Sequence, residues 1–336
     1  MTYLPELEAV ERILDLAGRQ LDVQVVHHVE LPAAVRIPVY AIGMGNRSRT
    51  VPAIGFFGGV HGLERIGAEV VIAFLQSLVM RLQWDTTLHQ QLESVRLVFM
   101  PIVNPGGMFM GTRANPRGVD LMRNAPVDAV DQVPFLIGGQ RISAGLPWYR
   151  GPVGAAMEPE NQALCSVVES ELLTRSFSMA LDCHSGFGAS DRIWFPDART
   201  RKPIAHLAEM QALKEVFLQT YSHHAYVFEP QSLQYLAHGD IWDFLYLQAL
   251  EQTNRMFLPL TLEMGSWLWI KKNPRQMFSL KGIFNPLIEH RQHRVLRRHL
   301  SLLDFLARAA CSHARWLPGE STRGKLHADA LKNWYE

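Results

Sequence analysis

Short, almost entirely apolar segments alternate along the chain with longer segments whose apolar residues recur every three or four positions. The first pattern is typical of strands that are covered on both faces, and the second is typical of amphipathic helices. The predicted strands cover residues 36–44, 51–59, 95–103, 177–184, 225–230 and 257–264. The predicted helices cover residues 64–82, 158–175, 203–220, 240–251 and 284–310, and a further surface helix is expected within residues 1–20.

This alternation of strands and helices predicts an α/β fold with a mixed, mostly parallel central β-sheet and helices on both faces. No internal repeat, low-complexity tract or Gly/Ser linker divides the 336 residues. We therefore expect one domain over residues 1–310, N-terminal helix included, followed by a polar C-terminal tail over residues 311–336.

Composition and charge exclude several classes of protein. The 33 basic and 32 acidic residues give a formal net charge of +1, which argues against a nucleic-acid-binding surface. The three cysteines lie far apart, which excludes a disulfide scaffold and an all-thiolate zinc site. The N-terminal residues do not have the apolar core of a secretory signal, and no run reaches the roughly 18 apolar residues of a membrane span. We therefore expect a cytoplasmic protein without a nucleic-acid or membrane partner, and its oligomeric state stays open.

One stretch of the chain is nevertheless rich in basic residues, immediately before and within the last predicted helix. Its members are Lys271, Lys272, Arg275, Lys281, Arg291, Arg294, Arg297 and Arg298. They form either a patch for nucleic acid or anionic lipid, or the solvated face of a helix whose apolar stripe packs on the sheet. The neutral total charge favours the second interpretation.

Side chains suited to metal binding follow three of the predicted strands. His61 and Glu64 come after the strand at 51–59, and their spacing places both on one side of a helical turn. His184 ends the strand at 177–184, before a glycine-rich loop, and Glu263 lies in the strand at 257–264. Functional groups collect at the carboxyl ends of strands in such sheets, so these side chains are expected to meet.

Two imidazoles and one carboxylate would leave the fourth position of a zinc ion open, as in catalytic zinc sites. A further glutamate could then take a proton from zinc-bound water and pass it to a leaving amine. The alternatives are a surface ion pair for His61 and Glu64 and a hydrogen-bonded buried histidine for His184. Cys183 neighbours His184 in the strand and is expected to face away from this site, as a packing residue.

The order of the motifs resembles that of the zinc carboxypeptidase family, peptidase family M14, from about residue 36 to residue 266. The motifs are His61-Gly62-Leu63-Glu64, Asn104-Pro105-Gly106-Gly107, the segment RANPRGVDLMRN at 113–124, Tyr149-Arg150-Gly151 before Glu158-Pro159-Glu160, His184-Ser185, and Glu263. Within enzymes, the nearest rivals are the aspartoacylase and succinylglutamate desuccinylase relatives. The N-P-G-G loop, the R-x-N spacing and Ser185 favour the peptidase side.

The resemblance implies one zinc ion, held by His61, Glu64 and His184, in a catalytic domain over residues 1–310. It also implies that Asp120 accepts the other ring N–H of His61, although a turn residue is the alternative. Glu263 would be the general base and then the acid.

On the substrate side, the resemblance implies that Arg113 stabilises the oxyanion and that Arg123 and Asn115 contribute to substrate binding. A structural salt bridge is the alternative for either arginine. Met122 stands where the family has asparagine, which puts recognition of a terminal carboxylate in doubt more than hydrolysis.

Two further candidates lie before Glu263. Tyr235 is the candidate for the mobile active-site tyrosine of the family. Asp240 either lies in a side-chain specificity pocket, where it would favour a basic group, or caps the helix that begins at Ile241.

The function expected from these residues is zinc-dependent hydrolysis of an amide bond, by a metallocarboxypeptidase that acts on short peptides. The alternatives are an N-acyl amino acid deacylase, a murein-peptide amidase, and an inactive zinc-binding protein that binds peptides. Met122 favours the last of these, whereas retention of the three ligands and Glu263 favours catalysis.

Overall fold

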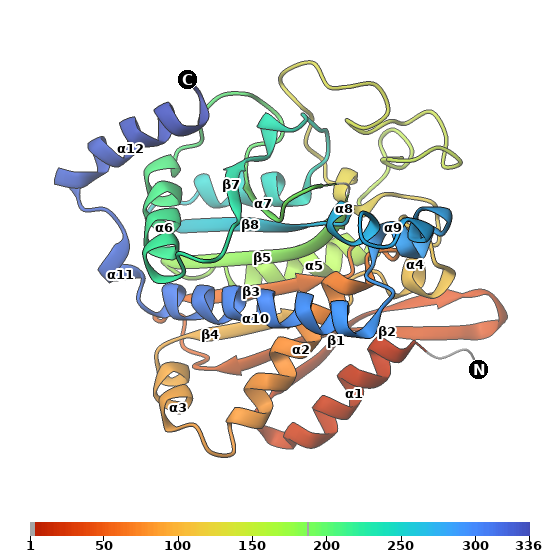
Figure 1. The fold of residues 1–336 in the computed structure, drawn as a ribbon, viewed down its shortest axis with the longest axis horizontal. Helices are drawn as coiled ribbons and strands as arrows, with labels where there is room; N and C mark the ends of the chain where they lie inside the picture. The colour runs from red at the N-terminus through yellow and green to blue at the C-terminus, as the bar shows by residue number, and fades with distance from the viewer. Residues whose placement is uncertain (1–3, 187) are drawn as a thin grey trace.

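The computed structural model describes residues 4–186 and 188–336, and in this part of the chain eight strands form one mixed sheet (Figure 1). The strands are β1 (Asp22–Leu31), β2 (Val35–Gly45), β3 (Ala53–Gly58), β4 (Arg96–Met100), β5 (Phe177–Gly186), β6 (Arg192–Phe195), β7 (Val227–Pro230) and β8 (Met256–Gly265). Their order is β1-β2-β4-β3-β5-β8-β6-β7. The central strands β4, β3, β5 and β8 run parallel, whereas β1, β2 and β6 run antiparallel to their neighbours in the pairs β1–β2, β2–β4 and β6–β8.

The helices cover both faces of this sheet, which confirms the predicted fold class. They are α1 (Pro5–Ala17), α2 (Arg65–Arg81), α3 (Thr86–Glu93), α4 (Pro105–Met110), α5 (Pro159–Glu171), α6 (Leu207–Thr220), α7 (Ile241–Leu250), α8 (Trp267–Ile270), α9 (Leu280–Phe284), α10 (Glu289–Cys311), α11 (His313–Trp316) and α12 (Glu320–Trp334). Helices α1, α2 and α10 lie in front of the sheet in Figure 1, and α5 and α7 lie behind it.

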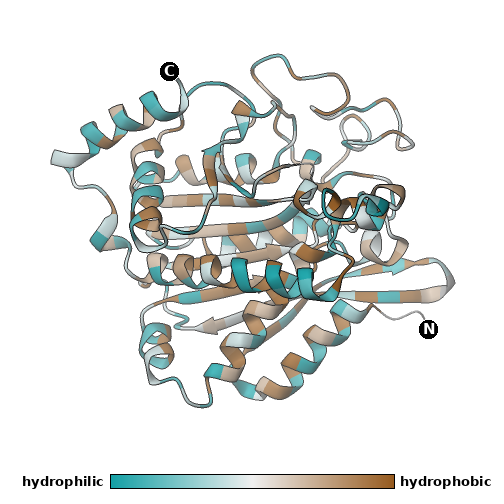
Figure 2. Cartoon of the chain, viewed as in Figure 1, coloured by the Kyte–Doolittle hydropathy of each residue, from teal (hydrophilic) through white to brown (hydrophobic). Residues whose placement is uncertain are grey.

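The core lies between the central strands and these helices. Strand β3 is buried along its whole length, as its unbroken apolar sequence predicts. The Phe56 ring packs on Phe74 of α2 and on Phe99 of β4, with centroids 5.0 and 5.3 Å apart. Brown, the hydrophobic end of the scale, recurs along the central strands in Figure 2. This packing fixes the ends of β3, β5 and β8 relative to one another.

Two strands and the C-terminal segment differ from the sequence expectation. Strand β1 pairs with β2 only, so most of its side chains are at least partly exposed and its sequence is not a continuous apolar run. Strand β6 has only four residues. The stretch expected to be a polar tail contains α11 and α12, and α12 packs on α6. The division of the chain at residue 310 stays a prediction.

No single helix in the described residues is long and apolar enough to cross a membrane. Helices α2 and α3 meet the length and composition criteria only when they are taken together, and the chain bends by 110° between them.

Candidate active site

The predicted site residues lie at the carboxyl ends of three neighbouring parallel strands. Gly58 at the end of β3 pairs with Cys183 of β5, and His184 pairs with Glu263 of β8. A tight turn follows β3 and leads into α2. This turn requires Gly62, because a Cβ atom there would lie 2.1 Å from the carbonyl carbon of Gly107. The close approach of two backbones thus sets the path of the segment that carries the first two candidate ligands.

His61, Glu64 and His184 are buried and converge on one point. His61 Nδ1 lies 2.9 Å from Glu64 Oε1, and His184 Nδ1 lies 3.1 Å from Glu64 Oε2. The two Nδ1 atoms are 3.2 Å apart, and one donor atom from each residue falls within 4.8 Å of the others. The structure therefore brings together the three residues that the sequence predicts as metal ligands.

Each imidazole has a carboxylate on its outer side. Asp120 Oδ1 lies 3.1 Å from His61 Nε2, as the sequence analysis expected, and Asp182 Oδ2 lies 2.7 Å from His184 Nε2. The indole N–H of Trp242 also donates to Asp182 Oδ2, at 2.8 Å. These carboxylates hold the Nε2 protons outward, which turns both Nδ1 atoms toward the centre.

The sequence analysis did not identify Asp182. The signal that could have found it is the alternation of side chains along a strand. Asp182 precedes His184 by two positions in β5 and therefore shares its face of the sheet.

Arg113 places a fixed positive charge beside the cluster. Its Nη1 donates to Glu64 Oε1 and its Nε donates to Asp120 Oδ2, both at 3.0 Å. Burial opposes the charge on Arg113, but the carboxylates of Asp120 and Glu64 outweigh it and raise the pKa of the guanidinium. Burial likewise favours a neutral Glu64, yet the neighbouring His61 and His184 hold the pKa of this carboxyl well below its usual value. The cluster is thus a set of paired charges.

Glu263 lies half-buried beside this cluster, directly across the sheet from His184. The space for its carboxylate exists because residue 186 is glycine: a Cβ atom there would lie 2.3 Å from Glu263 Oε1. Burial and, next, the negative charge of Glu64 raise the pKa of Glu263 to about 8. A carboxyl group in this environment can exchange a proton near neutral pH.

Arg123 and Tyr235 lie together near the cluster. Arg123 is 2% exposed; its Nε donates to the carbonyl of Ile137 and its Nη1 to the carbonyl of Met122. Its Nη2 is buried and has no hydrogen-bond partner among the described residues. The Tyr235 ring lies 5.5 Å from the Arg123 guanidinium and packs edge-on against Trp194. Arg123 therefore keeps one donor for an acceptor outside the described protein atoms.

Asn115 is occupied within its own loop. Its amide nitrogen donates to Glu158 at 2.8 Å, and its oxygen accepts from the backbone N–H groups of Arg117 and Val119. In this arrangement the side chain holds the loop, and the predicted contact with substrate stays untested.

Asp240 is the N-cap of α7. Its Oδ1 accepts from the N–H groups of Trp242 and Asp243, at 2.9 and 3.1 Å. Its Oδ2 is buried without a hydrogen-bond partner among the described residues. Asp240 therefore caps α7 through Oδ1, as one of the two sequence-based alternatives expected. That Oδ2 contributes to substrate specificity stays a prediction.

The sequence profile of the zinc carboxypeptidase family matches residues 16–266, which is more than half of the chain. The chain belongs to the zinc carboxypeptidase family.

Individual relatives of this zinc carboxypeptidase homologue are distant. Carboxypeptidase SOL1 of Arabidopsis thaliana is 30% identical over 92 residues, which are 26% of this chain and 19% of that protein. Carboxypeptidase D of Anas platyrhynchos is 23% identical over 177 residues, which are 49% of this chain and 11% of that protein. The matched part is thus less than a fifth of the length of either relative.

Solved structures show the same fold. Thrombin-activatable fibrinolysis inhibitor superimposes with a TM-score of 0.67 at 16% identity, over 92% of this chain and 75% of that one. Carboxypeptidase A from Helicoverpa armigera gives a TM-score of 0.65 at 14% identity, over 91% of this chain and 72% of that one. At such identities the similarity concerns the fold of a zinc carboxypeptidase and not its substrate.

The donor set fits the zinc that this family uses. Because Asp120 and Asp182 accept from the Nε2 atoms, the Nδ1 atoms of His61 and His184 present lone pairs to each other at 3.2 Å. Two bare acceptors repel at this distance, so the site needs a cation or a proton between them. Burial opposes a charge on His184, but Asp182 and Glu64 raise its pKa well above the usual value. Imidazole nitrogen and carboxylate oxygen are also the ligand types that zinc prefers.

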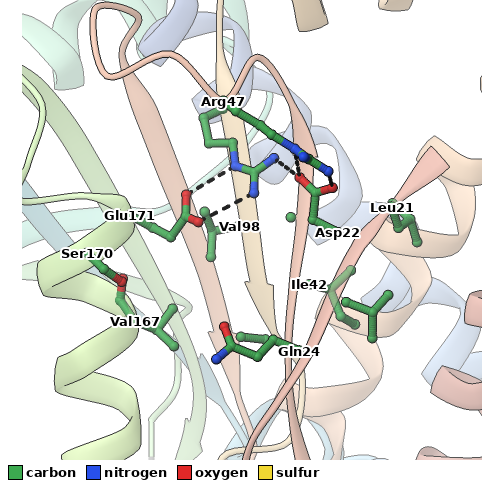
Figure 3. A pocket seen from close by; sticks show the side chains of 13 residues that line it. Leu21, Asp22, Gln24, Ile42, Arg47, Val98, Val167, Ser170 and Glu171 are labelled. Carbon is green, nitrogen blue, oxygen red and sulfur yellow. Dashed lines mark hydrogen bonds and ion pairs between the residues drawn. The ribbon is translucent and has the colours of Figure 1, made fainter. Parts of the chain in front are cut away.

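A separate cavity of about 670 Å³ opens at the other end of the strands (Figure 3). It is lined by charged residues from the start of β1 and β4 and from the end of α5. Arg96 donates to Asp22 at 2.6 Å and to Glu171 at 3.1 Å, and Arg47 pairs with Asp22. These charges neutralise one another, and the cavity contains none of the predicted site residues.

Proposed function

We propose that this protein is a zinc-dependent hydrolase that removes the C-terminal residue from short peptides. The observation that carries the proposal is the convergence of His61, Glu64 and His184 directly beside Glu263. This arrangement combines three protein ligands with a carboxyl group whose pKa lies near neutrality. A metal site that only supports the fold has no need of such a neighbour.

His61, Glu64 and His184 would hold one zinc ion, which supplies a Lewis acid for the carbonyl and acidifies water in the site. Glu263 takes the proton of the attacking water and delivers it to the leaving amine. Arg113 lies beside Glu64 and stabilises the negative charge that develops on the carbonyl oxygen.

Arg123 supports the choice of a carboxypeptidase among amide hydrolases. Its buried Nη2 has no acceptor among the described residues, and a substrate carboxylate would provide one. Tyr235 lies beside this guanidinium and would close over the bound carboxylate.

A second candidate is hydrolysis of an N-acyl amino acid or of a murein peptide. The observation that favours it is Met122, which is 5% exposed and packs in the hydrophobic core. This position therefore adds no polar group next to Arg123. The buried Oδ2 of Asp240 would suit a substrate with an amine, as a murein peptide has.

The test is a panel of zinc-loaded assays with short peptides, the same peptides with amidated C-termini, N-acyl amino acids and murein fragments. We expect hydrolysis of the free-acid peptides and a preference for them that Arg123→Gln removes. Hydrolysis of the amidated peptides at the same rate would contradict a carboxypeptidase, and turnover of N-acyl amino acids alone would favour the second candidate.

The general base has a test of its own. Glu263→Gln keeps the size of the side chain and is expected to lower kcat by about a hundredfold to ten-thousandfold, since it removes the proton acceptor. Zinc binding, measured by chelator competition, is expected to persist. A zinc-loaded wild type without activity on the whole panel would instead favour the inactive peptide-binding protein.

A further inference from the structure

The segment between β8 and α10, residues 266–288, carries positive charge only. It contains four basic residues, Lys271, Lys272, Arg275 and Lys281, and no acidic residue. All four are exposed. Within the described residues, none of them makes an ion pair with a carboxylate. Lys281 does lie near enough to Glu69 to oppose, in part, the rise that burial causes in the pKa of that carboxyl. We call this segment, with α8 and α9, the α8–α9 segment.

The same segment exposes large apolar side chains. They are Trp267, Leu268, Met277, Phe278 and Leu280, with exposed fractions of 40, 37, 49, 91 and 63%. Trp267, Leu268 and Met277, together with Ile270 and Pro274, also line an apolar hollow of about 380 Å³. Exposed apolar side chains that cluster in this way usually mark a surface that another body covers.

The inner side of the segment is fixed to the protein, so the exposed pattern belongs to an ordered surface. Gln276 Nε2 donates to the carbonyls of Gly282 and Asn285, both at 3.0 Å. The Asn285 side chain in turn accepts from the N–H of Ile66 and donates to the carbonyl of Leu63, in the turn that carries Glu64. The polar contacts of the segment therefore lie on its inner side, whereas its basic and large apolar side chains are exposed on the outer side.

This surface adjoins the strand ends of the candidate active site. The N–H of Ser266 donates to the carbonyl of Gly186 at 2.8 Å, and Ser185 Oγ donates to the carbonyl of Phe284 at 2.7 Å. In Figure 1, α8 and α9 lie at the end of the sheet where β5 and β8 terminate, and Figure 2 shows hydrophobic and hydrophilic residues mixed there.

Two basic residues of α10, Arg291 and Arg298, are a different case. Arg291 donates to the carbonyl of Trp269 at 3.2 Å, and Arg298 pairs with Asp191 at 3.1 Å and donates to the carbonyl of Ala225. These arginines hold neighbouring segments together. The basic stretch that the sequence treats as one unit therefore divides differently: Arg291 and Arg298 make internal contacts, whereas the four basic residues of the α8–α9 segment are exposed, as are Arg294 and Arg297 of α10.

We propose that the α8–α9 segment docks the protein on an anionic membrane surface, with the cations at the phospholipid headgroups and Phe278 and Leu280 inserted between them. Lipid covers both kinds of exposed group at once: the phosphates pair with the lysines, and the acyl boundary takes up the apolar side chains. An acidic polypeptide would match the four cations but would leave the aliphatic residues without a partner. The proposal revises the expectation of no membrane partner, which rested on spanning segments, since surface docking requires none.

The test uses co-sedimentation of the full chain with vesicles of phosphatidylcholine alone and with about a third phosphatidylglycerol. We expect binding to the anionic vesicles and weakening by salt. The double variant K271Q/K272Q is expected to bind about 30-fold more weakly, because each lysine near such a surface contributes about fivefold. The matched control is R201Q/K202Q, another adjacent pair of exposed basic residues, which should bind like the wild type.

The apolar contribution is tested with F278S/L280S. This double variant is expected to bind the vesicles at least tenfold more weakly, since that is about the contribution of burying one large apolar side chain. Its control is Trp84→Ser, since Trp84 is 73% exposed and follows α2, outside the α8–α9 segment. Circular dichroism and zinc affinity verify that each variant is folded. The docking can be measured without any hydrolytic activity, so it stands or falls separately from the proposed function.

Three outcomes would overturn the proposal: no sedimentation with anionic vesicles at low salt, equal binding to both kinds of vesicle, or anionic binding that neither double variant weakens. Retention on immobilised poly-glutamate together with failure to bind vesicles would also overturn it, and would assign the surface to an acidic polypeptide.

Discussion

At the scale of single residues, the two outer carboxylates give the candidate metal site a near-symmetrical construction. Asp120 holds His61, and Asp182 holds His184 while also accepting from Trp242. Asp182 Oδ1 is buried without a hydrogen-bond partner among the described residues. The contacts with His184 and Trp242 are both made by Oδ2. The ring orientation of His184 therefore depends on Asp182.

Replacing Asp182 by asparagine should weaken zinc binding by about tenfold to a hundredfold, because a neutral amide oxygen, a weaker acceptor, replaces the carboxylate that orients His184 and raises its basicity. Chelator competition measures the affinity, and the fluorescence of Trp242 should change with it. Cys183→Ala is the matched control, since the neighbouring side chain faces away from the site. Equal zinc affinity for wild type and D182N would show that the ring is held without this carboxylate.

The three thiols provide a test of burial at the same scale. Burial raises the pKa of Cys165 to about 12 and that of Cys183 well above its usual value, whereas Cys311 is only partly buried and its pKa rises less. Iodoacetamide at pH 8 to 9 should therefore modify Cys311 first in the native protein, and higher pH should accelerate that reaction. Mass spectrometry of the peptides identifies the site. Rapid native labelling of Cys183 would contradict its assignment as a packing residue and reopen a role as a nucleophile.

The candidate site was more predictable at this scale than the substrate-binding residues. His61, Glu64 and His184 each follow or end an apolar strand, and the meeting of strand ends is a general property of parallel sheets. The partners of Asn115 could not be read from its motif, because Glu158 lies 43 positions away and reaches it only through tertiary structure. The free Nη2 of Arg123 likewise depends on how the chain folds around it.

At the scale of elements, α12 shows how a polar sequence can dock. Its buried residues are Ala330 and Trp334, and its other positions are largely exposed. The Trp334 indole donates to the carbonyl of Phe228 at 2.7 Å, and its ring packs edge-on against Phe195. Trp334 thus anchors the last helix on β6 and β7, while Arg323 and Asn333 bind Glu209 and Gln211 of α6.

Trp334→Ala is expected to lower the free energy of unfolding by about 3–5 kcal/mol, the usual effect of truncating a buried aromatic residue. Thermal and urea unfolding measure it. The exposed Trp84 provides a matched control, since W84A should change stability by less than about 0.5 kcal/mol. If both variants unfolded like the wild type, α12 would not contribute to the stability of the domain.

The elements that the sequence predicted and those it missed differ in how much they bury. Fully covered strands such as β3 and long amphipathic helices such as α2 leave a clear periodicity in the sequence. Edge strand β1 exposes Val23 and Val25 beside Gln24 and Glu30, so its sequence shows no clean alternation, and β6 is too short to show a period. Helix α12 buries too few side chains to be distinguished from a solvated tail.

At the scale of the whole molecule, a metal ion would join two distant parts of the chain. His61 and Glu64 come from the turn after β3, whereas His184 lies 123 positions beyond His61. Binding energy at this point is therefore available to the folded protein and not to the unfolded chain.

Zinc is expected to raise the Tm for this reason. At a hundredfold excess over its Kd it adds about 2.7 kcal/mol, which corresponds to a shift of roughly 4 °C for a chain of this size. Scanning calorimetry with and without a chelator measures the shift, and calcium should have no effect because it prefers oxygen ligands. His61→Ala should abolish the zinc-dependent part of the shift. A Tm that does not respond to zinc in the wild type would argue against a folded-state site.

The order of the strands has a practical consequence. Strands β1 to β4 form one half of the sheet and β5 to β8 form the other, so the seam between β3 and β5 is also a division of the chain into two consecutive polypeptides. The seam passes between Glu64 and His184. A chain cut at the exposed Val153 would yield two fragments, each with an incomplete set of donor atoms. Zinc affinity would then report reassembly of the fragments, which makes this chain a candidate for a metal-controlled split protein.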